Sequence, residues 1–397
     1  MSNAQAPGPL AGIRVIDLTR ALSGPYATLM MADAGAEVIK VERPDGGDDS
    51  RGWGPPFLGD GDDRESSYFL SVNRNKLSVT LNLKDPDDVA VLRDLLVDAD
   101  VLVENFRPGV MERLGLGPQA LAALNDRLVV LSITGFGEGG PDGHRSGFDQ
   151  IVQGEAGLMA MTGHPGGQPT RFGVPITDIL SGMFGAWGVV TALYERERTG
   201  RGQRVTTSLL ASAVAVHAYQ GTRWTLGGDV VGLEGNRHAS IAPYGAFRCA
   251  DGWINIAVGS EGLWARFAPT VGIDADDSRF ATNHDRVTNW DDLEEAINRA
   301  TTTATVAEWM ARMDDAGVPA GRINTMDQVY ELPQVHHVGA VAEVEHPTAG
   351  HLRLPGSPVQ WSDHDDRPTS PPPRLGEHNE AVRRAAGRGT GERHHPG

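Results

Sequence analysis

Apolar and polar positions alternate in blocks along the first part of the chain, and these blocks predict strands separated by a helix. The predicted elements are a strand within 12–20, a helix at 24–36 and a strand at 37–42. The helix opens with Gly24-Pro25, and proline suits this place because the N–H group that it lacks would have no helical partner there. Strand, helix and strand at this spacing form a βαβ unit, so we expect a parallel sheet.

The same alternation recurs farther along the chain. Asp85-Pro86 is a typical start of a helix, because the aspartate side chain accepts a hydrogen bond from a free N–H group of the first turn. The further predicted elements are a helix at 85–100, a strand at 101–106, a helix at 119–127, a strand at 128–137, a long helix at 178–197, and a strand that runs into a helix at 204–224. The repeated pattern predicts an α/β fold.

The pattern changes after about residue 224, which suggests a second domain. The predicted elements beyond this point are a loop at 225–245, a β-hairpin at 246–260 with Asp251-Gly252 at its turn, a helical region to about 320, further β-structure at 335–361, and a tail from Ser362 that is extended and then polar. An Asp-Gly pair between alternating segments is a strong hairpin signal, since both residues tolerate positive φ.

Composition and charge narrow the class of protein. A chain of 397 residues with 40% hydrophobic residues can bury a core, and its length favours two domains or one large domain with a smaller one inserted. We see no apolar run of the ~18 residues that a membrane span needs, and the amino terminus lacks the features of a signal peptide. The single cysteine, Cys249, cannot form an internal disulfide, and the net charge of −17 argues against a general nucleic-acid binder. We expect a cytoplasmic globular protein without membrane or nucleic-acid partners.

The sequence contains no common catalytic or nucleotide-binding motif in the structural context that the motif requires. Residues 135–140, GFGEGG, match the dinucleotide pattern G-x-G-x-x-G, but Pro141 and Asp142 follow where a helix should begin. No P-loop, H-E-x-x-H, C-x-x-C or G-x-S-x-G motif occurs. The thirteen histidines show no ligand spacing with acidic residues, so we expect no metal site.

One acidic residue, Asp178, stands among apolar and small neighbours in the stretch RFGVPITDILSGMFGAWG. A Gly-Val-Pro turn precedes it and a predicted buried helix follows. Aspartate is a preferred helix N-cap, so a structural cap is the simpler interpretation of this stretch alone. A carboxylate at a helix N-terminus is also placed to act as a nucleophile, because the helix dipole stabilises negative charge there.

Seven segments, in order along residues 11 to 380, resemble the class III coenzyme A transferase family, which also contains the α-methylacyl-CoA racemases. They are GIRVIDLTRALSGPYATLMMADAGAEVIKVERP, NRNKLSVTLNLKDP, DVLVENFRPGVMERLGLG, GFDQIVQGEAGLMAMTG, ALYERERTGRGQRV, GVPAGRINTMDQVYELPQV and PPPRLGEHN. The resemblance implies a Rossmann-like α/β large domain (1–224), a smaller α+β domain (225–320), a C-terminal segment (321–397) that returns to the large domain, and an interlocked homodimer. It implies acyl-CoA and carboxylate substrates, with no tightly bound cofactor.

The resemblance also implies roles for individual residues. Asp178 corresponds to the family's catalytic nucleophile, which forms an aspartyl-CoA thioester. The residues expected to contact coenzyme A are Arg43, Leu81, Lys84, Asn105, Phe106 and Arg113. The residues expected to line the acyl pocket are Leu22, Phe148, Asp149, Arg237, His238 and Ser240. The last three lie in the segment GNRHASIAPYGAF, which resembles the branch acting on small dicarboxylic acyl groups such as succinyl or glutaryl.

This chain departs from the residue patterns of two branches of the family, and several functions remain as alternatives. Racemases carry a histidine where this chain has Phe148, and phenylalanine cannot transfer protons. Formyl-CoA transferases carry a glutamine at the position of Leu22 and a glycine-rich loop in place of GNRHASIAPYGAF. We expect CoA transfer from succinyl-CoA or a similar dicarboxylic acyl-CoA to a carboxylic acid. A racemase or epimerase, CoA transfer within one dicarboxylic molecule, and a CoA-binding protein without chemistry are the alternatives.

Overall fold

The computed structural model describes residues 8–364 and 369–387. They divide into two compact units. Unit 1 comprises residues within Met1–Leu158, Arg171–Gly227 and Pro333–Gly397, and unit 2 comprises Met159–Thr170 and Gly228–Leu332. The sequence-based boundaries at 224 and 320 differ from this division, which adds residues 159–170 to the second unit and extends it to 332.

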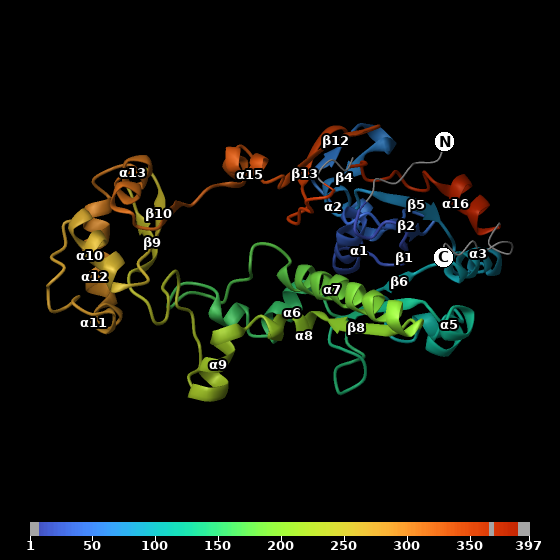
Figure 1. The fold of residues 1–397 in the computed structure, drawn as a ribbon, viewed down its shortest axis with the longest axis horizontal. Helices are drawn as coiled ribbons and strands as arrows, with labels where there is room; N and C mark the ends of the chain where they lie inside the picture. Colours follow the sequence, from blue (N-terminus) through green and yellow to red (C-terminus); the bar gives the residue numbers. More distant parts are fainter. Residues whose placement is uncertain (1–7, 365–368, 388–397) are drawn as a thin grey trace. The chain divides into compact units, whose positions relative to one another are not determined.

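Unit 1 is built on a six-stranded sheet with all strands parallel and the order β5-β2-β1-β6-β7-β8 (Figure 1). The strands are β1 (Arg14–Asp17), β2 (Glu37–Glu42), β5 (Lys76–Thr80), β6 (Val101–Glu104), β7 (Val129–Thr134) and β8 (Arg204–Ser208). The order reverses between β1 and β6. In open parallel sheets, ligands bind at such a switch point, beyond the carboxyl ends of the strands. The predicted α/β class with a parallel sheet is confirmed.

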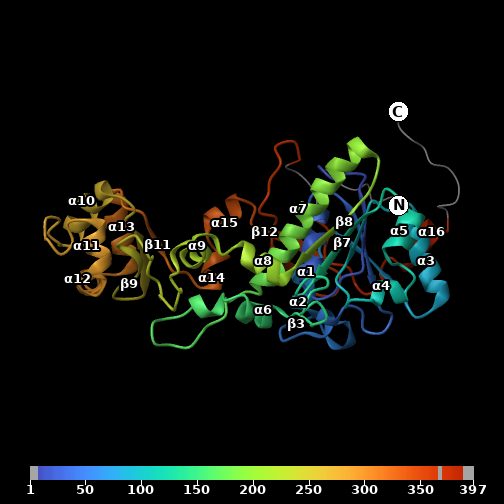
Figure 2. The same ribbon diagram turned by 90° about the horizontal axis from the view of Figure 1, so that it is seen from below.

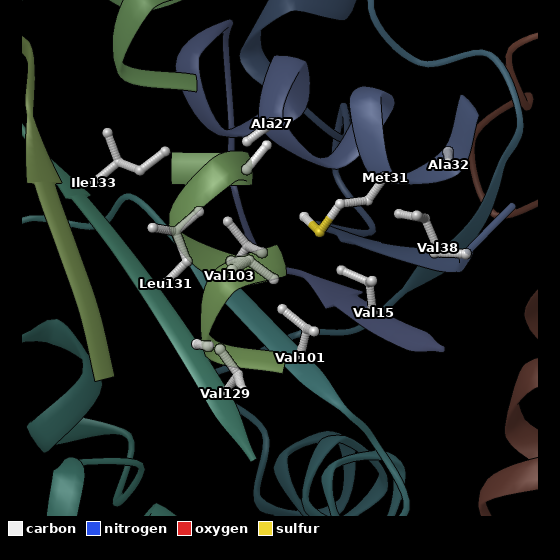
Figure 3. Close-up of a cluster of buried hydrophobic side chains, with 14 of the residues drawn as sticks. Val15, Ala27, Met31, Ala32, Val38, Val101, Val103, Val129, Leu131 and Ile133 are labelled. Carbon is white, nitrogen blue, oxygen red and sulfur yellow. The ribbon is translucent and has the colours of Figure 1, made fainter. Parts of the chain in front are cut away.

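Helices cover both faces of this sheet, because neighbouring residues of each strand point to opposite sides. Val15 of β1 packs with α1 (Ser23–Asp33), α7 (Ile176–Thr199) and α8 (Leu209–Ala215), as Figure 3 shows in part. Ile16 packs on the other face with α3 (Pro86–Val97), α5 (Pro118–Leu124) and α16 (Asn379–Ala386). Strands buried on both faces are rich in Val and Ile, which is why the hydrophobic pattern identifies them.

The long helix α7 lies along the sheet in both ribbon views (Figures 1 and 2). Gly185 allows a close approach to the sheet, since a Cβ there would lie 2.9 Å from Leu131 of β7. Gly182 allows a close approach to α1, since a Cβ there would lie 2.6 Å from the carbonyl oxygen of Ser23. Among the described residues, α7 alone is long and apolar enough to cross a membrane, by length and composition only. A core helix packed against other elements meets the same criteria, so the expectation of no membrane partner stays a prediction.

The C-terminal segment closes one edge of the sheet. The backbone N–H of His378 donates to the carbonyl of Ser78 in β5 at 2.9 Å, and the Asn379 side-chain oxygen accepts from the N–H of Thr80 at 2.7 Å. An uncovered edge strand can pair with a strand of another chain, and the C-terminal segment blocks such pairing along β5. The other elements of unit 1 are β3 (Phe57–Leu58), β4 (Glu65–Ser66), α2 (Ser67–Ser71), α4 (Val110–Arg113), α6 (Asp149–Glu155), α9 (Ala218–Gly227), α15 (Pro333–His337), β12 (Val341–His346) and β13 (Gly350–Pro355).

Unit 2 pairs a three-stranded antiparallel sheet with a group of helices. The strands are β9 (Tyr244–Arg248), β10 (Trp253–Ala257) and β11 (Ala320–Arg322), in the order β11-β10-β9. The hairpin predicted around Asp251-Gly252 is confirmed. Phe247, Ile254 and Trp264 belong to the core that joins this sheet to the helices. The helices are α10 (Glu261–Thr270), α11 (Asn283–Thr288), α12 (Trp290–Thr301), α13 (Val306–Ala316) and α14 (Met326–Val329).

Candidate active site

Asp178 lies in the first turn of α7, as the third residue of the helix. The helix begins at Ile176, and its N-cap position is held by Pro175, which offers no side-chain acceptor. The interpretation of Asp178 as the N-cap is therefore wrong, as is the predicted start of the helix at residue 178. The Asp178 carboxylate instead stands within the positive end of the helix dipole, where negative charge is stabilised.

The acceptor for the start of α7 comes from another helix, α6. The Asp149 Oδ1 atom accepts hydrogen bonds from the backbone N–H and the hydroxyl of Thr177, each at 2.9 Å. The Gln153 side-chain amide donates to Asp149 Oδ2 at 2.7 Å, and its oxygen accepts from the N–H of Phe172 at 2.8 Å. Gln153 is fully buried. Asp149 and Gln153 thus join α6, the segment before α7 and the first turn of α7 into one hydrogen-bonded unit.

This arrangement leaves the Asp178 carboxylate free to react. Among the described residues, no hydrogen bond to that carboxylate is present, and the Ser181 hydroxyl donates only to the Asp178 backbone carbonyl, at 2.9 Å. Burial, together with the negative charge of Asp149, raises the pKa of Asp178 to about 7. A carboxylate without donors and beside a like charge is a stronger base and nucleophile than one in water.

Tyr68 of α2 lies in the field of both carboxylates. Burial raises the pKa of its phenol to about 12, and the charges of Asp178 and Asp149 act in the same direction. Its ring packs edge-on against Trp53, with ring centroids 4.9 Å apart. Tyr68 therefore remains a hydrogen-bond donor at every physiological pH. We did not identify Tyr68 or Gln153 from the sequence, although the i, i+4 spacing of Asp149 and Gln153 on a helix signals their pairing.

The residues predicted for the acyl pocket divide between the two units. Leu22 is buried beside Tyr68 and Ile179, and Asp149 caps α7, so both lie around the first turn of α7. Phe148, just before α6, is 67% exposed.

Arg237, His238 and Ser240 belong to unit 2. The Arg237 guanidinium is ion-paired with Asp291 at 2.6 Å and Glu294 at 2.8 Å. The His238 ring accepts a hydrogen bond from the Ser240 N–H at 3.2 Å. Because Arg237 is already neutralised by two carboxylates, its predicted role in binding an acyl carboxylate would require it to exchange partners. The roles of these three residues stay predictions.

The residues predicted to bind coenzyme A follow the carboxyl ends of strands. Asn105 and Phe106 come directly after β6, next to the switch point, and Arg43 comes directly after β2. Arg43 donates to the Asp49 carboxylate at 2.7 Å and to the Gly47 carbonyl at 3.1 Å. Phe106 also lines a cavity of about 450 Å³ beside α4 and α5.

Three of the predicted contacts differ in accessibility. Lys84 and Arg113 are exposed and can reach a ligand. The Leu81 side chain is only 1% exposed and belongs to the core beneath α3, and its predicted contact with coenzyme A stays a prediction. The sequence could not distinguish these cases, since all three residues follow a strand or end a short helix. In the part of the chain that the structure describes, no three His, Cys, Asp or Glu side chains are grouped to hold a metal ion.

Comparisons with known proteins identify the family of this chain. Residues 10–379 match the model of CoA-transferase family III. The chain is 39% identical over 383 residues to the succinyl-CoA:glutarate CoA-transferase of Mus musculus, covering 96% of this chain and 87% of that protein. It is 39% identical over 385 residues to the acetyl-CoA:oxalate CoA-transferase of Acetobacter aceti, covering 96% of each. A solved CAIB/BAIF family protein from Brucella suis has a TM-score of 0.88 and 36% identity, covering 96% of this chain and 99% of that one. The resemblance seen in the sequence is confirmed, and the chain belongs to CoA-transferase family III, whose members are enzymes that use CoA thioesters as substrates.

Proposed function

We propose that the protein transfers CoA reversibly from a dicarboxylic acyl-CoA to a carboxylic acid, through a thioester on Asp178. The observation that carries this proposal is the Asp178 carboxylate itself. It stands in the first turn of α7, accepts no hydrogen bond among the described residues and has its pKa raised to about 7. The relatives that act on succinyl-CoA and glutarate support a dicarboxylic acyl donor.

The proposed reaction proceeds in balanced steps. A carboxylate oxygen of Asp178 attacks the acyl-CoA carbonyl carbon, the C–S bond breaks, and CoA leaves as a thiolate. The thiolate then attacks the side-chain carbonyl of the mixed anhydride, which releases the first acid as a carboxylate and leaves the Asp178 thioester. The acceptor acid reverses these steps. Each tetrahedral intermediate carries an oxyanion, which the N-terminus of α7 and a phenol donor such as Tyr68 can stabilise.

Asp149 supports the covalent intermediate through its charge. The free Asp178 carboxylate is repelled by Asp149, whereas the anhydride and the thioester of Asp178 are uncharged. Repulsion of the free carboxylate therefore favours the covalent states relative to the resting enzyme. The hydrogen bonds from Thr177 and Gln153 hold Asp149 in place without involving Asp178.

Mass spectrometry of the intact protein tests the mechanism. After mixing with succinyl-CoA or, separately, glutaryl-CoA, we expect a mass increase equal to CoA less one water, located at Asp178 after proteolysis. Hydroxylamine should convert it to a hydroxamate. Asp178→Ala, treated in parallel, should gain no mass. An adduct at another residue would contradict the proposal, and α-proton exchange with deuterated solvent in the absence of any adduct would favour the racemase alternative.

We also propose that the chain forms a homodimer. Met183, Trp187, Val190 and Tyr194 recur at helical spacing on α7, and Trp187 is 70% exposed. An exposed apolar stripe of this kind is typical of an interface. Wild-type protein is expected to show about twice the chain mass of 42.4 kDa in light scattering. Trp187→Glu should shift it toward the monomer, whereas Gln119→Glu, on exposed α5, should not. A monomeric wild type would contradict the proposal.

A further inference from the structure

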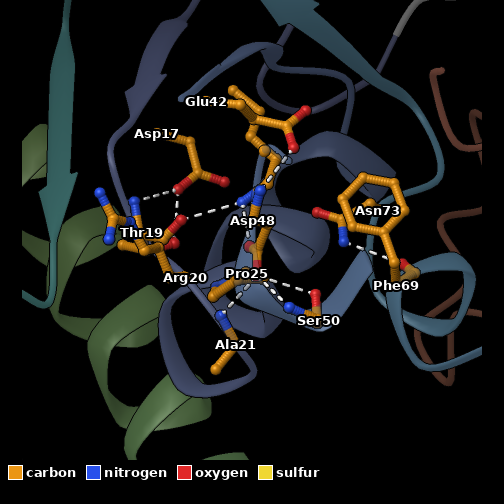
Figure 4. Close-up of polar contacts among 12 residues, drawn as sticks. Asp17, Thr19, Arg20, Ala21, Pro25, Glu42, Asp48, Ser50, Phe69 and Asn73 are labelled. Atoms are coloured by element: carbon orange, nitrogen blue, oxygen red, sulfur yellow. Dashed lines mark hydrogen bonds and ion pairs between the residues drawn. The ribbon is translucent and has the colours of Figure 1, made fainter. Parts of the chain in front are cut away.

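The loop that joins β1 to α1, residues 18–22, runs through the switch point of the sheet. Side chains from several parts of unit 1 hold its backbone, as Figure 4 shows in part. The Thr19 N–H donates to Asp17 at 2.9 Å, and the Thr19 carbonyl accepts from Lys40 Nζ at 2.9 Å. The Ala21 N–H donates to Asp48 Oδ1 at 3.1 Å. Successive peptide groups of this loop are thus each bound by a side chain.

Asn105 holds the residue between them. Its side-chain oxygen accepts from the Arg20 N–H at 3.0 Å, and its side-chain nitrogen donates to the Arg20 carbonyl at 2.9 Å. The amide thus pairs with both polar groups of one residue's backbone. We name Asp17, Lys40, Asp48 and Asn105 the loop clamp. In this structure the Asn105 amide contacts the backbone of Arg20, and the coenzyme A contact implied by resemblance stays a prediction.

The loop clamp imposes a backbone conformation that the chain would not choose by itself. Ala21 has φ of 66°, in the left-handed region that disfavours residues with a Cβ. Such strain persists only where surrounding contacts determine the conformation, and it is frequent at functional sites. Lys40 and Asp48 form a fully buried ion pair at 2.8 Å. Buried ion pairs contribute little net stability, so positional precision is the better account of this one.

The residue that the clamp orients is Arg20. Its guanidinium carbon lies 5.5 Å from the centre of the Phe106 ring, and among the described residues no carboxylate forms an ion pair with it. Burial and the positive charge of Arg43 lower the pKa of Arg20, against the opposing effect of Asp49 and Asp48. Arg43 is already paired with Asp49, so Arg20 is the cation at this edge that an external anion would stabilise.

The start of α1 adds to this anion preference. Leu22 occupies the N-cap position and provides no side-chain acceptor for the first turn of this 11-residue helix. Pro25 has no N–H group and Ser23 and Gly24 are buried, so this helix contributes its dipole, which favours an anion near its start. Arg20 lies in the same loop, immediately before this helix.

We propose that Arg20 binds a phosphate group of the CoA nucleotide, and that Asn105 and the rest of the loop clamp are positioning residues that hold Arg20 for this contact. The inference rests on the proposed function, since it takes acyl-CoA as the substrate of this site. Phosphate is favoured over the acyl carboxylate because Arg20 is flanked by Arg43 and Phe106 at the switch point. The planar guanidinium matches phosphate geometry with paired donors, whereas lysine would not.

Calorimetric titration without turnover tests the contact. CoA, 3′-dephospho-CoA and pantetheine are titrated into wild type and Arg20→Gln, with Arg312→Gln as the control. Arg312 is an exposed arginine in unit 2 that is likewise stacked on an aromatic ring, at 4.5 Å from Trp309. Arg20→Gln should weaken CoA binding by about 10- to 100-fold and leave pantetheine binding unchanged. The loss of affinity should be similar to the loss that wild type shows when the ligand lacks phosphate. Arg312→Gln should bind all three as wild type does.

Other outcomes would overturn the contact. Equal weakening for CoA and pantetheine, or no weakening, would exclude phosphate recognition by Arg20. Weakening that appears with succinyl-CoA and is absent with CoA and acetyl-CoA would assign Arg20 to the acyl carboxylate instead. Wild type that binds CoA but forms no Asp178 adduct would refute the proposed mechanism while leaving this inference intact. Wild type that fails to bind CoA would refute both.

A double-mutant cycle separates positioning from direct contact. Asn105→Ala should weaken CoA but not pantetheine, and the pair Arg20→Gln/Asn105→Ala should bind CoA no more weakly than Arg20→Gln alone. Additive losses would show that Asn105 acts independently of Arg20, and would overturn the positioning role. Circular dichroism of each variant identifies any loss of folding, which would lower binding of all ligands together.

Discussion

Asp178→Ala is expected to lower the rate of CoA transfer by at least about 10⁴-fold, because it removes the atom to which CoA is transferred. Steady-state transfer from succinyl-CoA to glutarate measures this loss. Binding of CoA should stay close to that of wild type, since the predicted nucleotide contacts lie at the other end of the substrate. Asp178→Glu is the matched control for charge: it keeps a carboxylate but displaces it by one methylene, and is expected to be severely impaired as well.

The loss of activity should come with a gain in stability. The pKa of Asp178 in the folded protein, about 7, is above that of an unfolded aspartate. Between these two values the folded state binds more protons, so Asp178 lowers the free energy of unfolding as pH rises from about 4 to about 7, and the penalty is complete above that range. Asp178→Asn removes the penalty and should raise the free energy of unfolding at pH 8 by about 1 kcal/mol or more. Urea unfolding at pH 8 and pH 5 measures the difference, which should be smaller at pH 5. A less stable variant at pH 8 would contradict the raised pKa.

Asp149→Asn is expected to move the pH dependence of the first half-reaction toward lower pH. In wild type, thioester formation needs ionised Asp178, so kcat/KM for succinyl-CoA should rise with pH through about 7 and then level off. At pH 6 about one-tenth of the limiting value is expected. The asparagine that replaces Asp149 carries no charge, so the midpoint should fall, although burial, the larger cause, keeps it above the ordinary aspartate value.

The limiting rate of the Asp149→Asn variant shows how much catalysis depends on the hydrogen bonds that residue 149 makes with Gln153 and the start of α7. An asparagine amide would meet the donating amide of Gln153, so the single variant also disturbs the support of α7. The double variant Asp149→Asn/Gln153→Glu restores a donor facing an acceptor and keeps an acceptor for the Phe172 N–H. It should recover the limiting rate while removing the negative charge from position 149. An unchanged pH midpoint in both variants would exclude Asp149 as a cause of the raised pKa.

Local sequence signals account for the elements that are apolar or strongly capped. Strand β2, Glu37–Glu42, has the predicted bounds, and α3 begins at Pro86 with Asp85 as its N-cap, as expected. Strand β5 was missed because Lys76 and Ser78, both buried, interrupt its apolar pattern. Their polar groups are satisfied by Asp17 and Glu42, which come from strands far away in the sequence. A pattern of hydrophobic positions cannot reveal such partners.

Other differences between the expectations from sequence and the structure have the same cause. Helix α7 begins before Asp178 because Asp149, distant in sequence, supplies the cap that the local segment lacks. Residues 159–170 group with unit 2 through contacts with residues beyond 228, such as the hydrogen bond from the Gly235 N–H to the Gly163 carbonyl at 2.8 Å. The helix α16 in the polar tail forms where Val382 and Ala386 can bury themselves against the sheet.

The sequence by itself determined the α/β alternation, the parallel sheet, the membership of a CoA-transferase family and the candidate nucleophile at the head of a long apolar helix. These follow from short-range signals: side-chain periodicity, caps, turns and ordered motifs. Only the tertiary structure decided that Asp149 and Gln153 support the helix of Asp178, that the Leu81 side chain is buried in the core, and that Asn105 holds the backbone of Arg20. Those relations join residues far apart along the chain. They arise only when folding brings strands together at one edge of a sheet, so no local pattern of residues contains them.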